Sequence, residues 1–111
     1  LLLEKGEAPD RALNLAKTAK EKLPDDPSVA DTLGWAYVAN ELYDSAISEL
    51  SMAAEKMPEH PTVQYHLALA QWKNGEKDPA LEALRASLKT EDAFPERKQA
   101  EALLKEIEAS E

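Results

Sequence analysis

The sequence contains no cysteine, only three glycines and few aromatic residues, and each shortage excludes a kind of protein. Without cysteine the chain forms neither disulfides nor a zinc site built on thiolates, although this leaves its compartment open. No apolar stretch approaches the roughly 20 residues that a membrane-spanning helix needs. β-branched residues are scarce as well, whereas Ala, Leu, Glu and Lys are abundant, so the composition favours helices over strands.

Positive charge is also in short supply. The 111 residues include 22 Asp and Glu against 13 Lys and Arg, which gives a formal net charge of −9. Nucleic acids and anionic membrane surfaces are bound mainly through Lys and Arg, so we expect neither as a partner. A protein or peptide with basic or apolar side chains suits this charge better.

A period of 34 residues organises the chain. Prolines recur one period apart, at Pro27, Pro61 and Pro95. Aspartates, alanines and large aliphatic residues keep the same step, namely Asp10, Asp44 and Asp78, then Ala12, Ala46 and Ala80, then Leu13, Ile47 and Leu81. A fixed period of this length predicts stacked copies of one supersecondary unit, each burying its apolar face against the next.

Each period is expected to contain two helices. Pro27 suits the first position of a helix, and Asp26 before it can cap that helix. Asn40 is expected to end the helix in a left-handed conformation, and Asn74-Gly75 would do so one period later. The spacing therefore predicts a helix over 27–40 that is followed by a tight turn.

The second helix of the unit is expected to begin at Asp44, with the aspartate as its N-cap, and its counterpart one period later at Asp78. In the first helix, Gly34 costs about 1 kcal/mol relative to alanine. This cost predicts that another helix approaches Gly34 closely. Ala46 and Ala53 on the second helix are expected to be small for the same reason.

The residues at the recurring positions resemble those of the tetratricopeptide repeat, which also has a period of 34 residues. The matching residues are Leu33, Gly34, Tyr37, Ala46, Leu50, Ala53 and Pro58 in one period, and Leu67, Ala68, Ala80, Leu84 and Ser87 in the next. The resemblance covers nearly the whole chain. It implies an all-α, right-handed superhelical solenoid of antiparallel helix pairs that ends in a C-terminal capping helix.

On this resemblance the chain is a single domain of four parts. Residues 1–26 are a partial repeat, mainly its second helix, and residues 27–60 are a complete repeat. Residues 61–94 are a complete but more divergent repeat, and residues 95–111 form the capping helix. Because the sequence starts with three leucines and no methionine, we expect it to be a piece of a longer protein.

A narrower resemblance concerns the segments 31–45 and 94–97. They are similar to the C-terminal repeats of bacterial tetratricopeptide proteins, some of which are lipoproteins associated with exopolysaccharide and protein-sorting systems. This resemblance leaves the localisation open between the bacterial periplasm or cell envelope and the cytoplasm.

Motifs for catalysis and metal binding are missing from the sequence. His60 and His66 are six residues apart in the chain, a spacing that does not place two ligands on one helix face. No nucleophile motif occurs, and three glycines are too few for a phosphate-binding loop. We therefore expect no enzyme activity, no cofactor and no metal site.

The tetratricopeptide family binds partners on the inner face of its superhelix, which the first helix of each repeat lines. The resemblance places six candidate binding residues on this face: Asp31, Trp35, Val38, Tyr65, Leu69 and Trp72. Aromatic side chains are frequent anchors in binding sites, and a carboxylate beside them favours a ligand with a basic residue. The alternative is that Trp35 and Trp72 fill gaps between adjacent repeats.

A scaffold that binds a protein or peptide is thus the first hypothesis for the function. The second is a structural array that associates with copies of itself or with further repeats, and the third is a domain that regulates an enzyme. Self-association is expected at the N-terminal end, where an apolar face lacks the first helix of its repeat. That face is formed by Ala12, Leu13, Ala16 and Leu23, and we expect a homodimer through it that charges at residues 1–3 would weaken.

Overall fold

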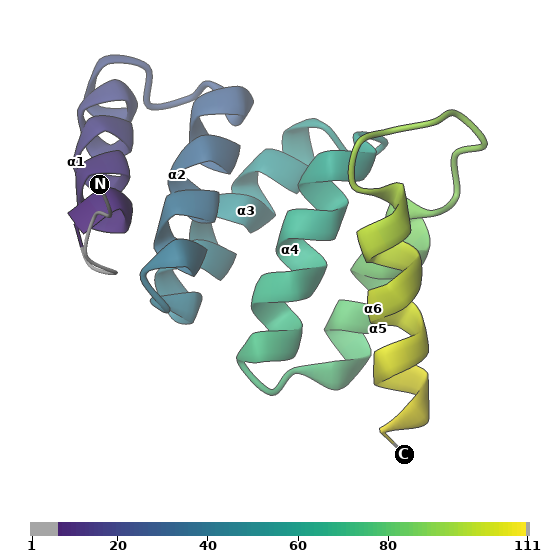
Figure 1. Cartoon of the computed structure of the whole chain (residues 1–111). Coiled ribbons are helices and arrows are strands. Elements are labelled where there is room, and N and C mark those ends of the chain that lie inside the picture. The colour runs from purple at the N-terminus through teal and green to yellow at the C-terminus, as the bar shows by residue number, and fades with distance from the viewer. Residues whose placement is uncertain (1–6, 111) are drawn as a thin grey trace.

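The computed structural model describes residues 7–110, which form six helices in a curved row (Figure 1). The helices are α1 (Glu7–Lys22), α2 (Pro27–Ala39), α3 (Tyr43–Lys56), α4 (Pro61–Lys73), α5 (Lys77–Ser87) and α6 (Arg97–Ala109). The prediction of an all-α fold is therefore confirmed. Within this part of the chain no helix is long and apolar enough to cross a membrane. Residues 1–6, which belong to the predicted partial repeat, lie outside the described residues.

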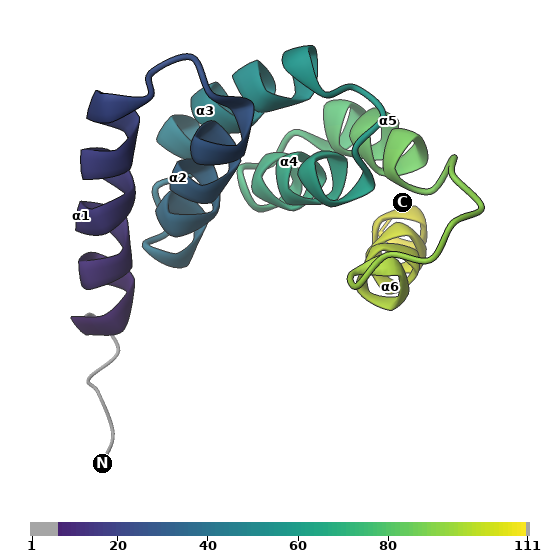
Figure 2. The same ribbon diagram turned by 90° about the horizontal axis from the view of Figure 1, so that it is seen from above.

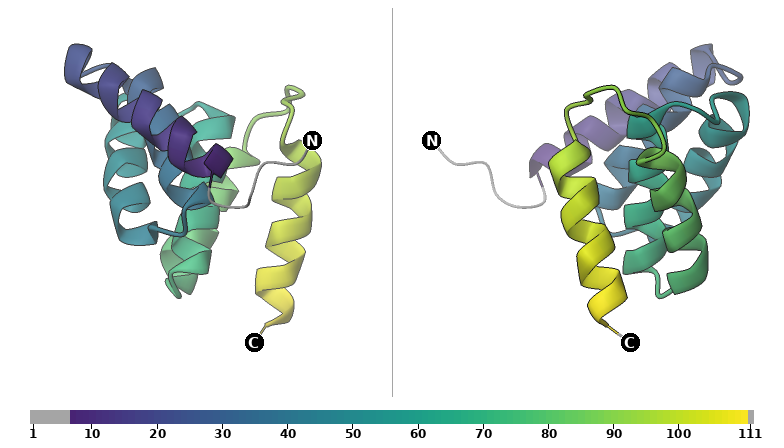
Figure 3. Two further views of the ribbon diagram at one scale, coloured as in Figure 1. Left: turned by 60° about the vertical axis from the view of Figure 1, so that its left-hand side comes forward. Right: turned by 90° about the vertical axis from the view of Figure 1, so that its right-hand side faces the viewer.

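Neighbouring helices pack in the order of the chain and form pairs that stand side by side. α2 pairs with α3, α4 pairs with α5, α1 lies against α2, and α6 packs on α5 and α4. Figure 2 shows that the row bends into an arc, with α3 and α5 on its outer side and α2 and α4 on its inner side. Figure 3 shows the two ends, where α1 runs obliquely across one and α6 stands beside α5 at the other.

Proline starts both inner helices, as the 34-residue period predicts. Pro27 opens α2, and the carboxylate of Asp26 before it accepts a hydrogen bond of 2.8 Å from the backbone N–H of Ser28. Pro61 opens α4, and the ring Nδ1 of His60 accepts a backbone N–H of the first turn at 3.4 Å. The period thus repeats as a local structure in which a polar side chain caps a proline-led helix.

The two outer helices begin one residue earlier than predicted. α3 starts at Tyr43 and α5 at Lys77, and the residues before them make no side-chain cap hydrogen bond. The prediction that Asp44 and Asp78 are N-caps is therefore wrong. Both lie in the first turn, where a carboxylate still interacts favourably with the positive end of the helix dipole. The Asp44 carboxylate instead accepts a hydrogen bond of 3.0 Å from the side-chain amide of Asn74.

The left-handed residue in each turn also lies one position later than predicted for Asn40. Asn40 has a φ of −97°, and the following Glu41 has a φ of 61°. One period later, Asn74 has a φ of −89° and Gly75 a φ of 82°. The turn therefore needs a left-handed residue directly after the asparagine, and only the second turn supplies glycine for it.

Gly34 lies at a close crossing between α2 and α3, which confirms the prediction from its helix-breaking cost. A Cβ atom at this position would sit 2.5 Å from Cγ of Leu50 and 3.3 Å from the carbonyl oxygen of Ala46. Leu50 and Ala46 are fully buried and belong to the main core. That core runs between the helix pairs and includes Ala30, Ala53, Val63, Ala68, Leu84 and Ile107.

The last helix begins two residues after Pro95, at Arg97, and not at the proline itself. It buries Ala100, Leu103 and Ile107 against the preceding pair. The guanidinium of Arg97 holds the loop before the helix by donating hydrogen bonds to the carbonyl oxygens of Thr90 and Asp92, the latter at 3.1 Å. The same guanidinium lies over the ring of Phe94, 5.1 Å from its centroid.

At the other end of the row, α1 packs against α2 through a small second cluster of buried residues. Leu13 and Ala16 contribute to this cluster from α1. The prediction that these two residues lack a neighbour is therefore wrong. Apolar residues that do lie open at this end are Ala12 and Leu15 of α1 and Leu23 directly after it, with Leu15 68% and Leu23 53% exposed.

Candidate protein-binding face

The inner face of the arc is formed by α2, α4 and α6, which lie side by side. Side-chain hydrogen bonds link these helices at separations of one period. The Thr62 hydroxyl donates to Glu96 at 2.7 Å, and Trp72 Nε1 donates to Glu106 at 3.1 Å, and each pair is 34 residues apart. The six candidate residues come from the first two of these helices, Asp31, Trp35 and Val38 from α2 and Tyr65, Leu69 and Trp72 from α4.

Trp35 is the most open of the candidate residues and rests on an aromatic base. Its indole is 38% exposed and stacks on the imidazole of His66, with ring centroids 3.9 Å apart and 19° between the planes. The ring of Tyr65 lies behind the pair, 6.4 Å from the indole centroid and tilted by 49°. Tyr65 and His66 are only 8% and 7% exposed, so α4 supplies a rigid, buried support for one exposed ring of α2.

Asp31 does not offer a free carboxylate to a ligand. Its Oδ1 lies 2.8 Å from Nδ1 of His66, and both side chains are largely buried. The bond fixes the orientation of the imidazole, because one ring nitrogen is held while the ring face stays against Trp35. The prediction that Asp31 attracts a basic residue of a ligand therefore stays a prediction, and one oxygen of its carboxylate is already bound by His66.

Tyr65 is a buried phenol in the base of this face. Burial, followed by the negative charge of Glu96, raises the pKa of Tyr65 above its ordinary value. Glu96 is itself held by the hydroxyl of Thr62. Tyr65 is therefore neutral across the physiological range and acts as an apolar support with one polar tip.

The remaining candidates are covered to a greater extent. Trp72 is half-buried in the main core, and its indole N–H donates to Glu106 of α6. Val38 and Leu69 are half-buried and pack against the same core. Of the two tryptophans, Trp72 is thus mostly covered by packing, whereas the ring of Trp35 lies open.

Sequence reasoning missed His66 as a member of this face. It considered the histidine only as a metal ligand, and within residues 7–110 no three His, Cys, Asp or Glu side chains gather as a metal site. The signal was available in the spacing, because Asp31 and His66 are one period and one residue apart. Polar residues about one period apart face each other across adjacent inner helices, as Trp72 and Glu106 also do.

Comparison with solved structures identifies the architecture. The fold matches MamA (MSR-1 C2) with a TM-score of 0.77 and 26% sequence identity, over 96% of this chain and 59% of the MamA chain. It matches PcrH, solved in complex with the chaperone binding region of PopD, with a TM-score of 0.78 and 20% identity, over 93% of this chain and 80% of the PcrH chain. The chain thus spans 59% of the length of MamA.

No protein-family model and no curated protein matches the sequence. MamA and PcrH are both tetratricopeptide-repeat proteins. The narrower resemblance to bacterial lipoproteins of exopolysaccharide and protein-sorting systems stays a prediction. The chain therefore has a tetratricopeptide-like fold, in which six helices pack in sequential pairs within residues 7–110.

Proposed function

We propose that the chain is a protein-interaction scaffold that holds a peptide or protein segment on its inner face, with Trp35 as the central anchor. The observation that carries the proposal is the exposed indole on its base of His66 and Tyr65. An aromatic ring that is already held in place loses little conformational freedom when a ligand covers it. Val38 and Leu69 add apolar surface.

The comparison with PcrH supports this reading. That structure was solved with the chaperone binding region of PopD bound, so one protein of this architecture takes up a segment of another protein. The position of that segment is not transferred to this chain. The comparison supports the kind of partner, a stretch of polypeptide. An apolar anchor suits such a partner better than it suits a small polar metabolite.

The experiment compares two tryptophans with different surroundings. Peptides selected from a displayed random library on the intact chain would be titrated by calorimetry against the Trp35→Ala and Trp72→Ala variants. Trp35→Ala is expected to weaken binding by about 2 kcal/mol, roughly thirtyfold, while the helix content stays intact. Trp72→Ala is expected mainly to lower the melting temperature, because it removes the contact of α4 with Glu106 of α6.

Glu21→Ala serves as the control, because this side chain is exposed on α1, outside the inner face that α2, α4 and α6 form. Selected peptides that bind the Trp35→Ala variant as tightly as the unmodified chain would refute the proposal. A selection that yields no binding peptide for the unmodified chain would count against it as well.

The second candidate function is self-association through the N-terminal end. One specific observation favours it, namely the two exposed leucines at this end, Leu15 on α1 and Leu23 directly after it. Large apolar side chains that lie open on one helix face mark a site of association more often than isolated ones do. The two functions are compatible, since they use different faces of the molecule.

A further inference from the structure

A groove runs along the outer side of the arc between α3 and α5. Both helices pack on α4, but their backbones do not approach each other closely, so α4 forms the floor between them (Figure 2). A hollow of about 350 Å³ lies there, and a second of about 640 Å³ continues from it toward the loop after α5, with Ala86 in the lining of both. None of the six candidate residues of the inner face lines either hollow.

The lining of the smaller hollow combines small apolar groups with one unsatisfied polar atom. Ala54, Leu67 and Ala83 supply the apolar surface, one from each of the three helices. Gln71 of α4 also lines the hollow, and its Oε1 is buried without a hydrogen-bond donor among the described residues. A buried acceptor that lacks a donor is unfavourable, so a donor brought by a ligand would gain more here than at the open surface.

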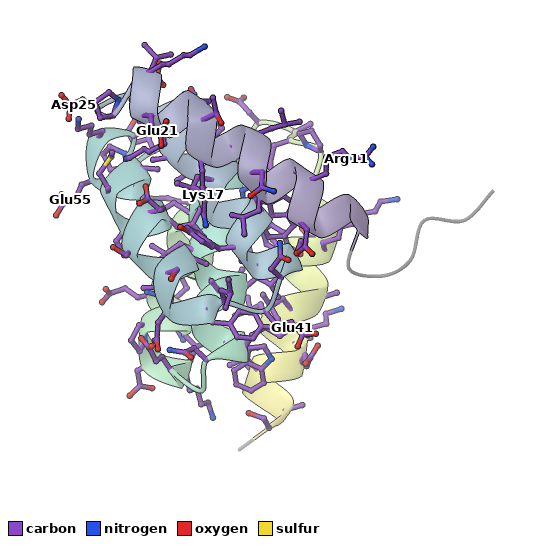
Figure 4. The ribbon with its side chains drawn as sticks, turned by 90° about the vertical axis from the view of Figure 1, so that its left-hand side faces the viewer. Arg11, Lys17, Glu21, Asp25, Glu41 and Glu55 are labelled. Carbon is purple, nitrogen blue, oxygen red and sulfur yellow. The ribbon has the colours of Figure 1, made fainter. Side chains whose placement is uncertain are left out.

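Two carboxylates flank this hollow from opposite sides. Glu55 stands on α3 and Glu82 on α5, both are exposed, and neither has an ion-pair or hydrogen-bond partner within residues 7–110. Figure 4, in which Glu55 is labelled, shows its side chain at the outer edge of the molecule. Glu49, by contrast, is neutralised by Lys20 at 3.0 Å. The flanks of the smaller hollow therefore carry uncompensated negative charge, whereas the larger hollow is lined by Lys89 as well as by Glu59 and Asp92.

We propose that this outer groove binds an arginine side chain that a basic segment of a partner protein presents. The aliphatic stem of arginine packs on alanine and leucine, as long basic side chains do on apolar surface. Its planar guanidinium carries five N–H donors, which suit an amide oxygen and two carboxylates together. Rotation about the last side-chain torsion of Gln71 turns its oxygen toward the guanidinium. Glu55 and Glu82 then close over the charge from both sides.

This site goes beyond the proposed function of the inner face and does not depend on it. The groove and the inner face lie on opposite sides of the helix pairs, with α3 and α5 on one side and α2 and α4 on the other. A partner that uses both sites would contact the row of helices on its inner and outer sides. Loss of either site by mutation is expected to leave the other intact.

The test uses the tripeptide acetyl-Gly-Arg-Gly-amide as the probe and its citrulline analogue as the matched control. Citrulline has nearly the same shape but carries no charge. Titration of the ¹⁵N-labelled chain, followed by two-dimensional NMR, is expected to shift the side-chain amide of Gln71 and the backbone amides of Ala54 and Ala83. The shifts should saturate with the arginine probe and be at least about tenfold weaker with citrulline, because the charge-assisted bonds are missing.

Two variants locate the charge that is recognised. The double change Glu55→Gln and Glu82→Gln is expected to weaken binding of the arginine probe about tenfold. The control, Glu21→Gln on α1 with Glu108→Gln on α6, removes the same charge and is expected to leave this binding unchanged. Both variants alter exposed side chains, so the fold is retained and the comparison stays valid. Shifts scattered over the acidic surface, equal binding of citrulline, or equal weakening by the two variants would each overturn the proposal.

Discussion

The indole of Trp35 lies on the imidazole of His66, with the two ring centroids 3.9 Å apart across the boundary between adjacent helix pairs. His66 in turn holds the carboxylate of Asp31, so one side chain connects an exposed aromatic ring to a largely buried acid. This arrangement couples the shape of the inner face to the packing of α2 on α4. Substitution of His66 is therefore expected to affect both the stability of the chain and the binding of a ligand to the inner face.

His66→Ala is expected to lower the free energy of unfolding by about 2 kcal/mol. It removes the ring under Trp35 and leaves the Asp31 carboxylate without its partner. His66→Phe keeps a ring at this position but not the hydrogen bond, and in the Asp31→Asn background it should be less harmful than in the unmodified chain. Urea unfolding of the unmodified chain, His66→Phe, Asp31→Asn and the double variant measures the coupling between the two residues. Strictly additive effects on the free energy of unfolding would contradict this coupling.

Tyr65 makes stability depend on pH in the alkaline range. Its folded pKa lies above the ordinary value of about 10, because of burial and then the charge of Glu96. Above pH 10 the unfolded chain loses this proton while the folded chain still retains it. The contribution is therefore fully present below about pH 10 and is lost as the pH rises through the folded pKa.

The melting temperature is accordingly expected to fall as the pH rises above about 10, and Tyr65→Phe should make this fall shallower. Tyr43→Phe is the control, in which the fall persists because Tyr65 is still present. An unchanged slope in Tyr65→Phe, measured by circular dichroism at several pH values, would show that the phenol does not carry this dependence.

Much of the architecture could be predicted from the sequence, because residues with strong local conformational preferences mark the 34-residue period. Pro27 and Pro61 start helices for a reason that lies within one turn of each proline, and the structure begins both helices there. Gly34 was recognised because glycine inside a helix has a cost that only a close neighbour justifies. Leu50 supplies that neighbour.

The candidate site was harder to predict, since it depends on how one helix pair is rotated against the next. The family resemblance indicated which residues face inward, but it did not indicate that His66 lies under Trp35 or that Glu106 covers Trp72. The cap at Asp44 failed for a related reason. The left-handed residue is Glu41, one position later than the predicted Asn40, and the helix already begins at Tyr43, with Leu42 at the N-cap position.

The two left-handed turn residues give a matched pair of stability predictions. Gly75→Ala is expected to cost about 1 kcal/mol, although the added Cβ would meet no atom within 4 Å, because only the backbone conformation is unfavourable. Glu41→Gly relieves the same conformation at the equivalent position and is expected to stabilise the chain by about 0.5 kcal/mol. Urea unfolding measures both, and effects of the same sign in the two variants would contradict the account.

The open side of α1 carries the last prediction. Ala12 and Leu15 of this helix and Leu23 directly after it are exposed, and Figure 4 shows the molecule from the end at which α1 lies. The counterparts of Ala12 in the later pairs, Ala46 and Ala80, are fully buried, because α2 and α4 cover them. The described part of the chain offers no such helix to α1. A second copy of the chain is a ready source of cover for these leucines.

We therefore predict that the chain self-associates at micromolar concentrations and that Leu15→Glu together with Leu23→Glu makes it monomeric. Because both side chains are more than half exposed in one copy, the charges should leave the melting temperature of the dilute chain nearly unchanged. Asn14→Glu with Thr18→Glu adds the same charge on another exposed part of α1 and should leave association largely intact. Sedimentation equilibrium measures the association. Association through Leu15 and Leu23 would be ruled out if the unmodified chain remained strictly monomeric at high micromolar concentration. It would also be ruled out if the two double variants weakened association equally.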